Sequence, residues 1–245
     1  FVHNERMDRF MSHYQEDLRE NLFIRIPKEI FEEDYWRKLP SASKSIYPVI
    51  LKHINAQGTC FPSEETIAKL AGVTPKTVRE GLKGLDGLPG FEKEKYSTQR
   101  GYSGYRYMID PVGKKVKVIS ISHAFFNGGN WSELTPSAKA IYPVLKYFSW
   151  WDYDLYIEHE DVDYENADED SISPDSPYPL RKHDFINPDN ENVAQFSGVD
   201  IRSIRSSYQS LIDNGFMEHH GMIEGRETWK LFTRPSLTLS ENITH

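Results

Sequence analysis

The clearest pattern of hydrophobic and polar residues lies between residues 60 and 85. Ile67, Leu70 and Ala71 recur at the spacing of one face of an α-helix. They follow Ser63, a residue type that commonly caps helix N-termini, and they precede Gly72, which suits the left-handed position that often ends a helix. The pattern predicts a short amphipathic helix that begins after Ser63 and ends at Gly72.

A second helix is predicted directly after this turn. Thr74 can cap it, and Pro75 suits its first position because the missing N–H would have no helical partner there. Its buried face would carry Val78, Leu82 and Leu85. Two short helices joined by a tight glycine turn form a helix-turn-helix, whose second helix enters the DNA major groove. The outward residues of that recognition helix would be Lys76, Thr77, Arg79, Glu80 and Lys83.

Alternating segments on either side of a polar tip predict a β-hairpin between Phe91 and Ile109, the wing of a winged helix. The basic residues of this wing, which we expect to face DNA, are Lys93, Lys95, Arg100 and Arg106. A second hairpin is predicted between Phe216 and Phe232. It offers Arg226 and Lys230 but also Glu218, Glu224 and Glu227, so its affinity for phosphates would be weaker.

The chain repeats itself at two constant offsets. LPSASKSIYPV at residues 39–49 is matched by LTPSAKAIYPV at residues 134–144, an offset of 95 residues. Residues 67–85 are matched by residues 193–211 at an offset of 126, so the second copy holds an insertion of 31 residues. In that copy Asp200 would cap the recognition helix, and the outward residues would be Arg202, Ser203, Arg205, Ser206 and Gln209. Trp36 and Trp131, which match at the first offset, are expected to anchor the core.

These patterns predict an α+β chain, mostly helical, built from two tandem winged helix-turn-helix domains related by an internal repeat. The expected organisation is an N-terminal helix within residues 1–21, a first domain at 22–117, a second domain at 118–236 with an acidic insertion at 149–184, and a tail at 237–245. The N-terminal helix has Phe10, Tyr14 and Leu18 at near-helical spacing, so it could pair with a second copy of the chain or pack on the first domain.

The net charge of −8 argues at first against DNA binding, because Lys and Arg supply most of the affinity for phosphates. Residues 149–184, however, hold 12 acidic residues against Arg181 and Lys182, which leaves the rest of the chain at +2. We interpret this stretch as a solvated loop. An alternative hypothesis is that it competes with DNA for a basic face, and deleting it would then change DNA affinity. It does not fit a calcium loop, because Asn166 stands where Gly is needed and Ile172 where Glu is needed.

The run CFPSEETIAKLAGVTPKTVREGLKGL at residues 60–85 resembles the winged helix-turn-helix domains of phage and plasmid replication proteins and of many bacterial regulators. FIRIPKEIF followed by LPSASKSIYPV is similar to the opening of plasmid replication-initiator winged helices. The resemblance implies sequence-specific binding of double-stranded DNA at an origin, with replication proteins or a second copy of the chain as further partners.

Two other functions remain open. A transcriptional regulator would share every feature above, and a winged-helix adaptor would bind protein instead of DNA. Arg79 and Arg205 are the best candidates for base or phosphate contacts, although either could pair with a nearby acid. We see no catalytic motif, cofactor site or metal site, so we do not expect an enzyme. One cysteine, Cys60, and the lack of a long apolar run lead us to expect a cytoplasmic protein without a membrane segment.

Overall fold

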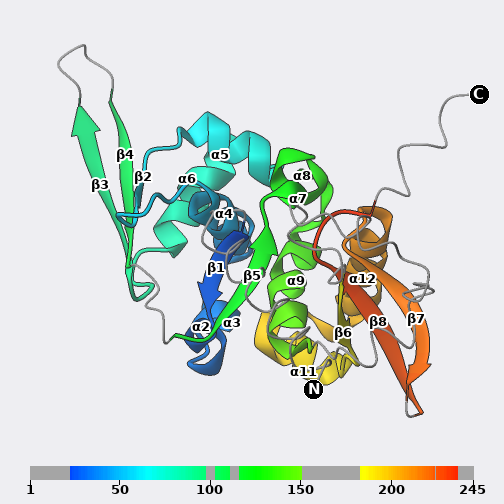
Figure 1. Ribbon diagram of the computed structural model, residues 1–245. Coiled ribbons are helices and arrows are strands. Elements are labelled where there is room, and N and C mark those ends of the chain that lie inside the picture. The colour runs from blue at the N-terminus through cyan, green and yellow to red at the C-terminus, as the bar shows by residue number, and fades with distance from the viewer. Residues whose placement is uncertain (1–22, 98–102, 111–115, 151–182, 224, 237–245) are drawn as a thin grey trace, which may run out of the picture.

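The computed structural model describes residues 23–97, 103–110, 116–150, 183–223 and 225–236. The predicted N-terminal helix, Arg100, the tail and most of the acidic insertion therefore lie outside the described residues. We refer to residues 23–110 as half one and to residues 116–236 as half two. Figure 1 shows half one on the left and half two on the right.

The two halves carry the same order of elements. Half one consists of β1 (Phe23–Pro27), α2 (Glu29–Glu32), α3 (Tyr35–Lys38), α4 (Ser41–Lys52), β2 (Thr59–Cys60), α5 (Glu64–Ala71), α6 (Pro75–Gly84), β3 (Phe91–Ser97) and β4 (Ser103–Ile109). Half two consists of β5 (Val118–Ser122), α7 (Ala124–Asn127), α8 (Asn130–Glu133), α9 (Pro136–Phe148), β6 (His183–Ile186), α11 (Asn190–Ser197), the 3-10 turn η2 (Ile201–Ser203), α12 (Ile204–Asp213), β7 (Met217–Ile223) and β8 (Arg226–Phe232). Helices and strands are thus mixed, as an α+β chain requires, while the origin of the halves by duplication stays a prediction.

The predicted caps form in half one. The Ser63 side chain accepts a hydrogen bond from the amide of Thr66, and the Thr74 side chain accepts one from the amide of Thr77. Gly72 ends α5 with φ +62°, a left-handed conformation that glycine adopts without steric cost. Local chemistry therefore sets both ends of this turn.

In half two the turn is built from different cap residues. Asp189 caps α11, Gly198 ends it with φ +67°, and Asp200 accepts a bond from the amide of Arg202. Asp200 caps the short turn η2 rather than the regular helix that we expected, and α12 begins only at Ile204. The recognition segment of half two therefore begins with a 3-10 turn, whereas that of half one begins directly as an α-helix.

Each half also carries one three-stranded antiparallel sheet, with strand order β2-β4-β3 in half one and β6-β8-β7 in half two. The predicted hairpins are observed as the pairs β3–β4 and β7–β8. In the second hairpin the register shifts between His219 and Gly221. Figure 1 shows the two hairpins pointing to opposite corners of the molecule.

The prediction of a solvated loop over residues 149–184 is wrong at its two ends. Trp150 forms a β-bridge with Phe185, and Asp184 is buried in β6, where its carboxylate accepts a hydrogen bond from the Lys146 ammonium of α9. Asp184 lies opposite Leu231 of β8, and its side chain is only 3% exposed, so the ion pair with Lys146 compensates the cost of burying its charge. The count of acidic residues assigned Asp184 to the acidic stretch, whereas its ion pair with Lys146 makes its side chain part of the packed interior of half two.

The halves meet along an antiparallel ribbon formed by β1 and β5. Ile24 pairs with Ile121, and Ile26 pairs with Ile119. The equivalences at the 95-residue offset are crossed, because Ile24 is equivalent to Ile119 and Ile26 is equivalent to Ile121. Arg25 lies opposite its own counterpart, Ser120. A pairing in which equivalent residues exchange partners is the property of a two-fold axis, so an approximate two-fold axis passes near the Arg25–Ser120 pair.

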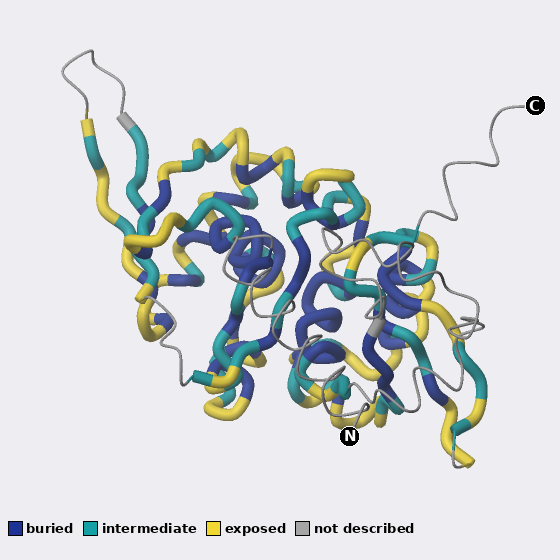
Figure 2. The backbone as a smooth tube through the Cα atoms, in the orientation of Figure 1, coloured by how far each residue is buried: buried dark blue, intermediate teal, exposed yellow. Residues whose placement is uncertain are grey.

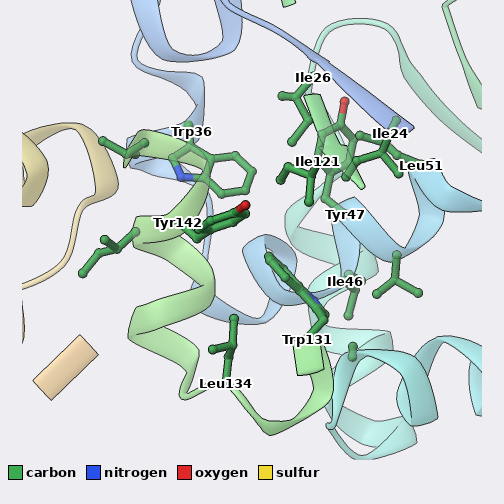
Figure 3. Close-up of a cluster of buried hydrophobic side chains, with 14 of the residues drawn as sticks. Ile24, Ile26, Trp36, Ile46, Tyr47, Leu51, Ile121, Trp131, Leu134 and Tyr142 are labelled. Carbon is green, nitrogen blue, oxygen red and sulfur yellow. The ribbon is translucent and has the colours of Figure 1, made fainter. Parts of the chain in front are cut away.

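The two tryptophans bond across the same axis. The Trp36 indole nitrogen donates to the backbone oxygen of Ala140, 2.9 Å away, and the Trp131 indole nitrogen donates to that of Ser45, 3.1 Å away. Ala140 and Ser45 are themselves equivalent at the 95-residue offset. Both indoles are fully buried, and Figure 3 draws them within one cluster of side chains that come from both halves.

The glycine turns also fit against the opposite half. A Cβ atom added at Gly72 would lie 1.9 Å from the Ser132 backbone oxygen, and one added at Gly198 would lie 2.5 Å from that of Arg37. Helix α5 consequently packs on α8, and α11 packs on α3. The buried residues of both halves form one continuous core, which runs through the middle of Figure 2.

We expect Gly72→Ala to destabilise the protein more than Gly87→Ala. Both glycines have positive φ, but an added Cβ at Gly87 would meet nothing within 4 Å. Gly87→Ala should therefore lower the free energy of unfolding only by the cost of holding alanine in the left-handed conformation, about 1–2 kcal/mol. Gly72→Ala adds the clash with Ser132, so its free energy of unfolding in urea should fall further. Equal losses for the two variants would contradict the close packing of α5 on half two.

Candidate nucleic-acid interface

Helix α6 is held by its buried face and presents a polar face to solvent. Val78, Gly81 and Leu82 are buried against the core. A Cβ atom at Gly81 would lie 2.9 Å from the Ala42 backbone oxygen, so α6 approaches α4 closely and has little room to move. The predicted contact residues on the other face are Lys76, Arg79 and Lys83, which are exposed, and Thr77, which is half-buried.

Arg79 forms an ion pair with Glu64 at the start of α5, with 2.9 Å between the guanidinium and the carboxylate. The Arg79 side chain remains 58% exposed. An exposed pair of this kind contributes about 0–1 kcal/mol, so a phosphate or a guanine could replace Glu64 at little cost. Thr77 is engaged locally, because its hydroxyl bonds that of Thr74 and its amide completes the cap.

The basic residues of the first wing divide into two kinds. Lys95 is exposed, and its ammonium lies 6.0 Å from the centre of the Tyr105 ring, while the partly exposed Arg106 pairs with Glu94. Lys93 is only 18% exposed, and its ammonium bonds the Leu82 backbone oxygen at 2.9 Å and pairs with Asp86 at 2.6 Å. A lysine at the last carbonyls of a helix stabilises that end, so Lys93 ties β3 to α6.

The outward residues of half two lie along α12 and the turn before it. Arg202, Arg205, Ser206 and Gln209 are exposed and line an open groove of about 700 Å³, which Glu133 of α8 also borders. Arg202 pairs with Asp200 at 2.8 Å, and hydrogen bonds from Arg202 lower the pKa of Asp200 to about 2. Gln209 donates to Asp213 at 2.7 Å. Ser203 is half-buried, and its backbone oxygen accepts the hydroxyls of Ser206 and Ser207.

The second wing pairs its bases with its acids. Lys230 lies 3.9 Å from Glu218, and His219 lies 3.2 Å from Glu227. Arg226 is exposed at the start of β8. The sequence-based expectation of a mixed-charge wing is therefore observed, and phosphate binding by this wing stays a prediction.

Sequence reasoning missed two buried lysines that support the turns. Lys44 donates to the backbone oxygens of Ser197, at 2.8 Å, and Arg37, at 3.1 Å, while its counterpart Lys139 donates to Ser132 at 3.2 Å. Burial lowers the pKa of both lysines to about 8. The sequence did indicate that these lysines need partners, because Lys44 lies among the apolar residues of α4 and Lys139 among those of α9, where an unpaired charge is rarely found.

A second open groove, of about 640 Å³, lies beside the turn of half two. Arg37 and Lys38 of half one line it together with Gly198 and Asp200. Helix α3 of half one thus places two basic residues, Arg37 and Lys38, beside the turn at which the recognition segment of half two begins. The repeat alone could not predict this, because the equivalent residues beside the first turn are Ser132 and Glu133.

The described part of the chain holds neither a candidate metal-binding cluster nor a candidate membrane-spanning helix. It contains no group of three or more histidine, cysteine or acidic residues that could hold a metal ion. Nor does it contain a helix long and apolar enough to cross a membrane. Cys60 is buried, and burial raises the pKa of its thiol to about 12.

Residues 37–88 match the family model of a helix-turn-helix domain. The match spans α4, β2, α5 and α6, the elements that hold and present the polar face described above. It supports a helix-turn-helix DNA-binding protein. No curated protein matches the chain, and no solved structure does.

The buried lysines give the stability of the protein a specific pH dependence. Between pH 8 and pH 10.4, the ordinary pKa of lysine, Lys44 and Lys139 are deprotonated in the folded chain and protonated in the unfolded chain. The unfolded state then binds more protons, so these two groups make stability rise with pH across this window.

We therefore expect the free energy of unfolding of the wild type to rise with pH relative to that of a Lys44→Met, Lys139→Met variant. The comparison uses urea unfolding at several pH values between 7.5 and 10.5. An unchanged difference between the two proteins across this range would contradict the burial of the two ammonium groups.

Proposed function

We propose that the protein binds specific sequences in double-stranded DNA through two winged helix-turn-helix units, one in each half, and that it acts as a plasmid or phage replication initiator. The observation that carries the proposal is the exposed basic face of α6, which is fixed to the core by α4 and followed by a basic hairpin. The helix-turn-helix match over residues 37–88 supports the same surface.

In half one, α6 would enter the major groove. Lys76, Arg79 and Lys83 would contact base edges or phosphates, and arginine suits guanine because it can donate two parallel hydrogen bonds. Lys95 and Arg106 of the wing would contact the backbone beside that groove, and Arg100 of the tip is predicted to join them. Lys93 would act indirectly by holding the wing on α6.

In half two, α12 would enter a second stretch of major groove. Arg202 and Arg205 would contact guanines or phosphates, and Gln209 is suited to adenine. Ser203 and Ser206 would bond phosphates or bases, and Arg226 would contact the backbone from the wing. Arg37 and Lys38, supplied by half one, add positive charge where the wing of half two offers little.

The initiator role rests on the likeness of residues 23–31 and 39–49 to the opening of replication-initiator winged helices, and of residues 60–85 to winged helices of phage and plasmid replication proteins and of bacterial regulators. A transcriptional regulator would use the same surface, and the position of the natural site, at an origin or at a promoter, distinguishes the two. A cytoplasmic setting and further partners, a second copy of the chain or replication proteins, follow from the same proposal.

We expect DNA affinity to fall steeply with salt, with a slope of log affinity on log salt near −0.9 for each phosphate contact. The DNA is a duplex selected from a random-sequence pool by the wild-type protein. Lys95→Ala should lower affinity and reduce the slope by about 0.9. Arg79→Ala should lower affinity by about 1–3 kcal/mol if it contacts a base.

The control is Lys117→Ala, an exposed lysine directly before β5 and outside both recognition segments and wings, which should leave affinity unchanged. Affinity that is independent of salt, or equal in the wild type and Arg79→Ala, would argue against DNA binding by α6 and for an adaptor.

A further inference from the structure

We propose that Glu64 is a specificity-determining residue, which directs Arg79 toward a guanine and away from the DNA phosphates. The proposal rests on the DNA-binding function above and adds how half one distinguishes one base pair. It follows from the ion pair at the start of α5, from the elements that hold this pair, and from the different residue at the equivalent position of half two.

The first turn of α5 holds the Glu64 side chain in place. Ser63 caps this helix, and Glu64 is its first residue. The Glu64 side chain is only 22% exposed although it carries a charge. It lines a groove of about 490 Å³ together with Tyr107 of the first wing, and burial and then the charge of Glu64 raise the pKa of Tyr107. The carboxylate therefore lies between α5 and the wing, next to the polar face of α6.

Arg79 reaches this carboxylate from the exposed face of α6. Its Nη1 donates to Oε2 of Glu64 at 2.9 Å. A guanidinium has five N–H donors in a planar fork, and this hydrogen bond uses one of them. Bidentate reading of guanine O6 and N7 uses two. Arg79 can therefore keep its bond to Glu64 while it binds a guanine, and the pair orients the fork before DNA arrives.

The same carboxylate opposes a phosphate contact. A phosphate that approached the Arg79 guanidinium would also approach the negative charge of Glu64, and like charges placed together disfavour such a partner. Glu65 adds to this effect. Hydrogen bonds from its own backbone and from Ser63 lower the pKa of Glu65, and the nearby charge of Arg79 lowers it further. Guanine O6 and N7 are uncharged acceptors, so the acidic surroundings favour a base over a phosphate.

Half two has a different arrangement at the equivalent position. Arg205 corresponds to Arg79, but Asn190 stands where half one has Glu64. The Asn190 side-chain oxygen accepts a hydrogen bond from the Tyr208 hydroxyl at 3.1 Å. Among the residues that the structure describes, no carboxylate pairs with Arg205. The two equivalent arginines therefore divide the work: Arg79 reads a base, and Arg205 contacts phosphate.

The test compares Glu64→Gln with the wild type on three duplexes. The first is the duplex selected by the wild type. In the second, an A·T pair replaces the G·C pair at which Arg79→Ala loses its preference, and the third is an unrelated sequence of the same length. Glu64→Gln keeps the size of the side chain and removes its charge. Glu80→Gln is the matched control, because it removes an equal charge from the exposed residue next to Arg79.

We expect Glu64→Gln to lower the ratio of affinities for the first and second duplexes about two- to fivefold, the range of an exposed ion pair. Its affinity for the unrelated duplex should rise. The slope of log affinity on log salt should steepen there by about 0.9, because Arg79 gains a phosphate. Glu80→Gln should leave the ratio unchanged, and Glu64→Asp, which keeps the charge on a shorter side chain, should give an intermediate ratio.

A second comparison changes the DNA instead of the protein. Replacing the selected guanine by 7-deazaguanine removes the N7 acceptor and leaves the base pair intact. This change should weaken binding by the wild type more than binding by Glu64→Gln, because only the wild type holds the Arg79 fork in the reading orientation. Equal losses for the two proteins would overturn the orienting role of Glu64.

Equal losses of affinity on all three duplexes would also overturn the proposal, because Glu64 would then only support the fold. So would a wild-type preference that depends on Arg79 at no base pair. Unchanged affinity of Glu64→Gln for the unrelated duplex would overturn the claim that Glu64 turns Arg79 away from phosphates. Should Glu64→Gln fail to fold, Glu64→Asp gives the same comparisons. Failure of the wild type to bind any duplex is a different result, since it rejects the proposed function itself.

Discussion

The structure depends on two buried indole groups that find their hydrogen-bond acceptors in the opposite half. A buried N–H without a partner costs about 1–3 kcal/mol, so neither Trp36 nor Trp131 could be placed favourably by its own half alone. The Trp36 indole donates to a backbone oxygen of α9, and the Trp131 indole donates to one of α4. The acceptor residues are the sequence neighbours of Lys139 and Lys44, whose ammonium groups bond the backbone beside the two glycine turns. These hydrogen bonds join α3 and α8, which carry the tryptophans, to α9 and α4, and the lysines of α4 and α9 extend the contacts to the two glycine turns.

This symmetric frame carries unequal chemistry. In half one the exposed Lys95 of the wing adds to a basic helix face, although Lys93 and Arg106 pair with acids. In half two the exposed Arg226 lies on a wing whose other bases, His219 and Lys230, pair with Glu227 and Glu218. Half one compensates through α3, which places Arg37 and Lys38 beside the second turn. The ion pair of Lys146 with Asp184 is likewise specific to half two, because the equivalent residues of half one are Leu51 and Gly58. Symmetry therefore fixes where the two surfaces lie, and sequence divergence sets what each can bind.

The sequence predicted the elements well because their causes are local. Caps at Ser63 and Thr74, the glycine at position 72 and the alternation in the hairpins each act within a few residues, and each is observed. Trp36 and Trp131, which match at the 95-residue offset, make reciprocal hydrogen bonds between the halves, and the internal repeat itself stays a prediction.

The packing between the halves could not be predicted in the same way. Periodicity indicates that a face is buried but not what covers it, so the exchange of contacts across the axis was invisible in the sequence. For the same reason Asp184 was placed in a solvated loop, and Lys93 was assigned to DNA although it anchors the wing to α6. The exposed positions of Lys76, Arg79, Arg205 and Gln209 agree with the expected faces, and their contacts with DNA stay predictions.

The shared core should hold the two recognition segments at a fixed separation. The most direct measurement is the distance between nitroxide labels at Lys83→Cys and Gln209→Cys, determined by pulsed electron paramagnetic resonance with and without the selected duplex. We expect one narrow distance distribution that DNA leaves unchanged. A broad distribution in the free protein, or a shift to a new distance on DNA, would contradict it.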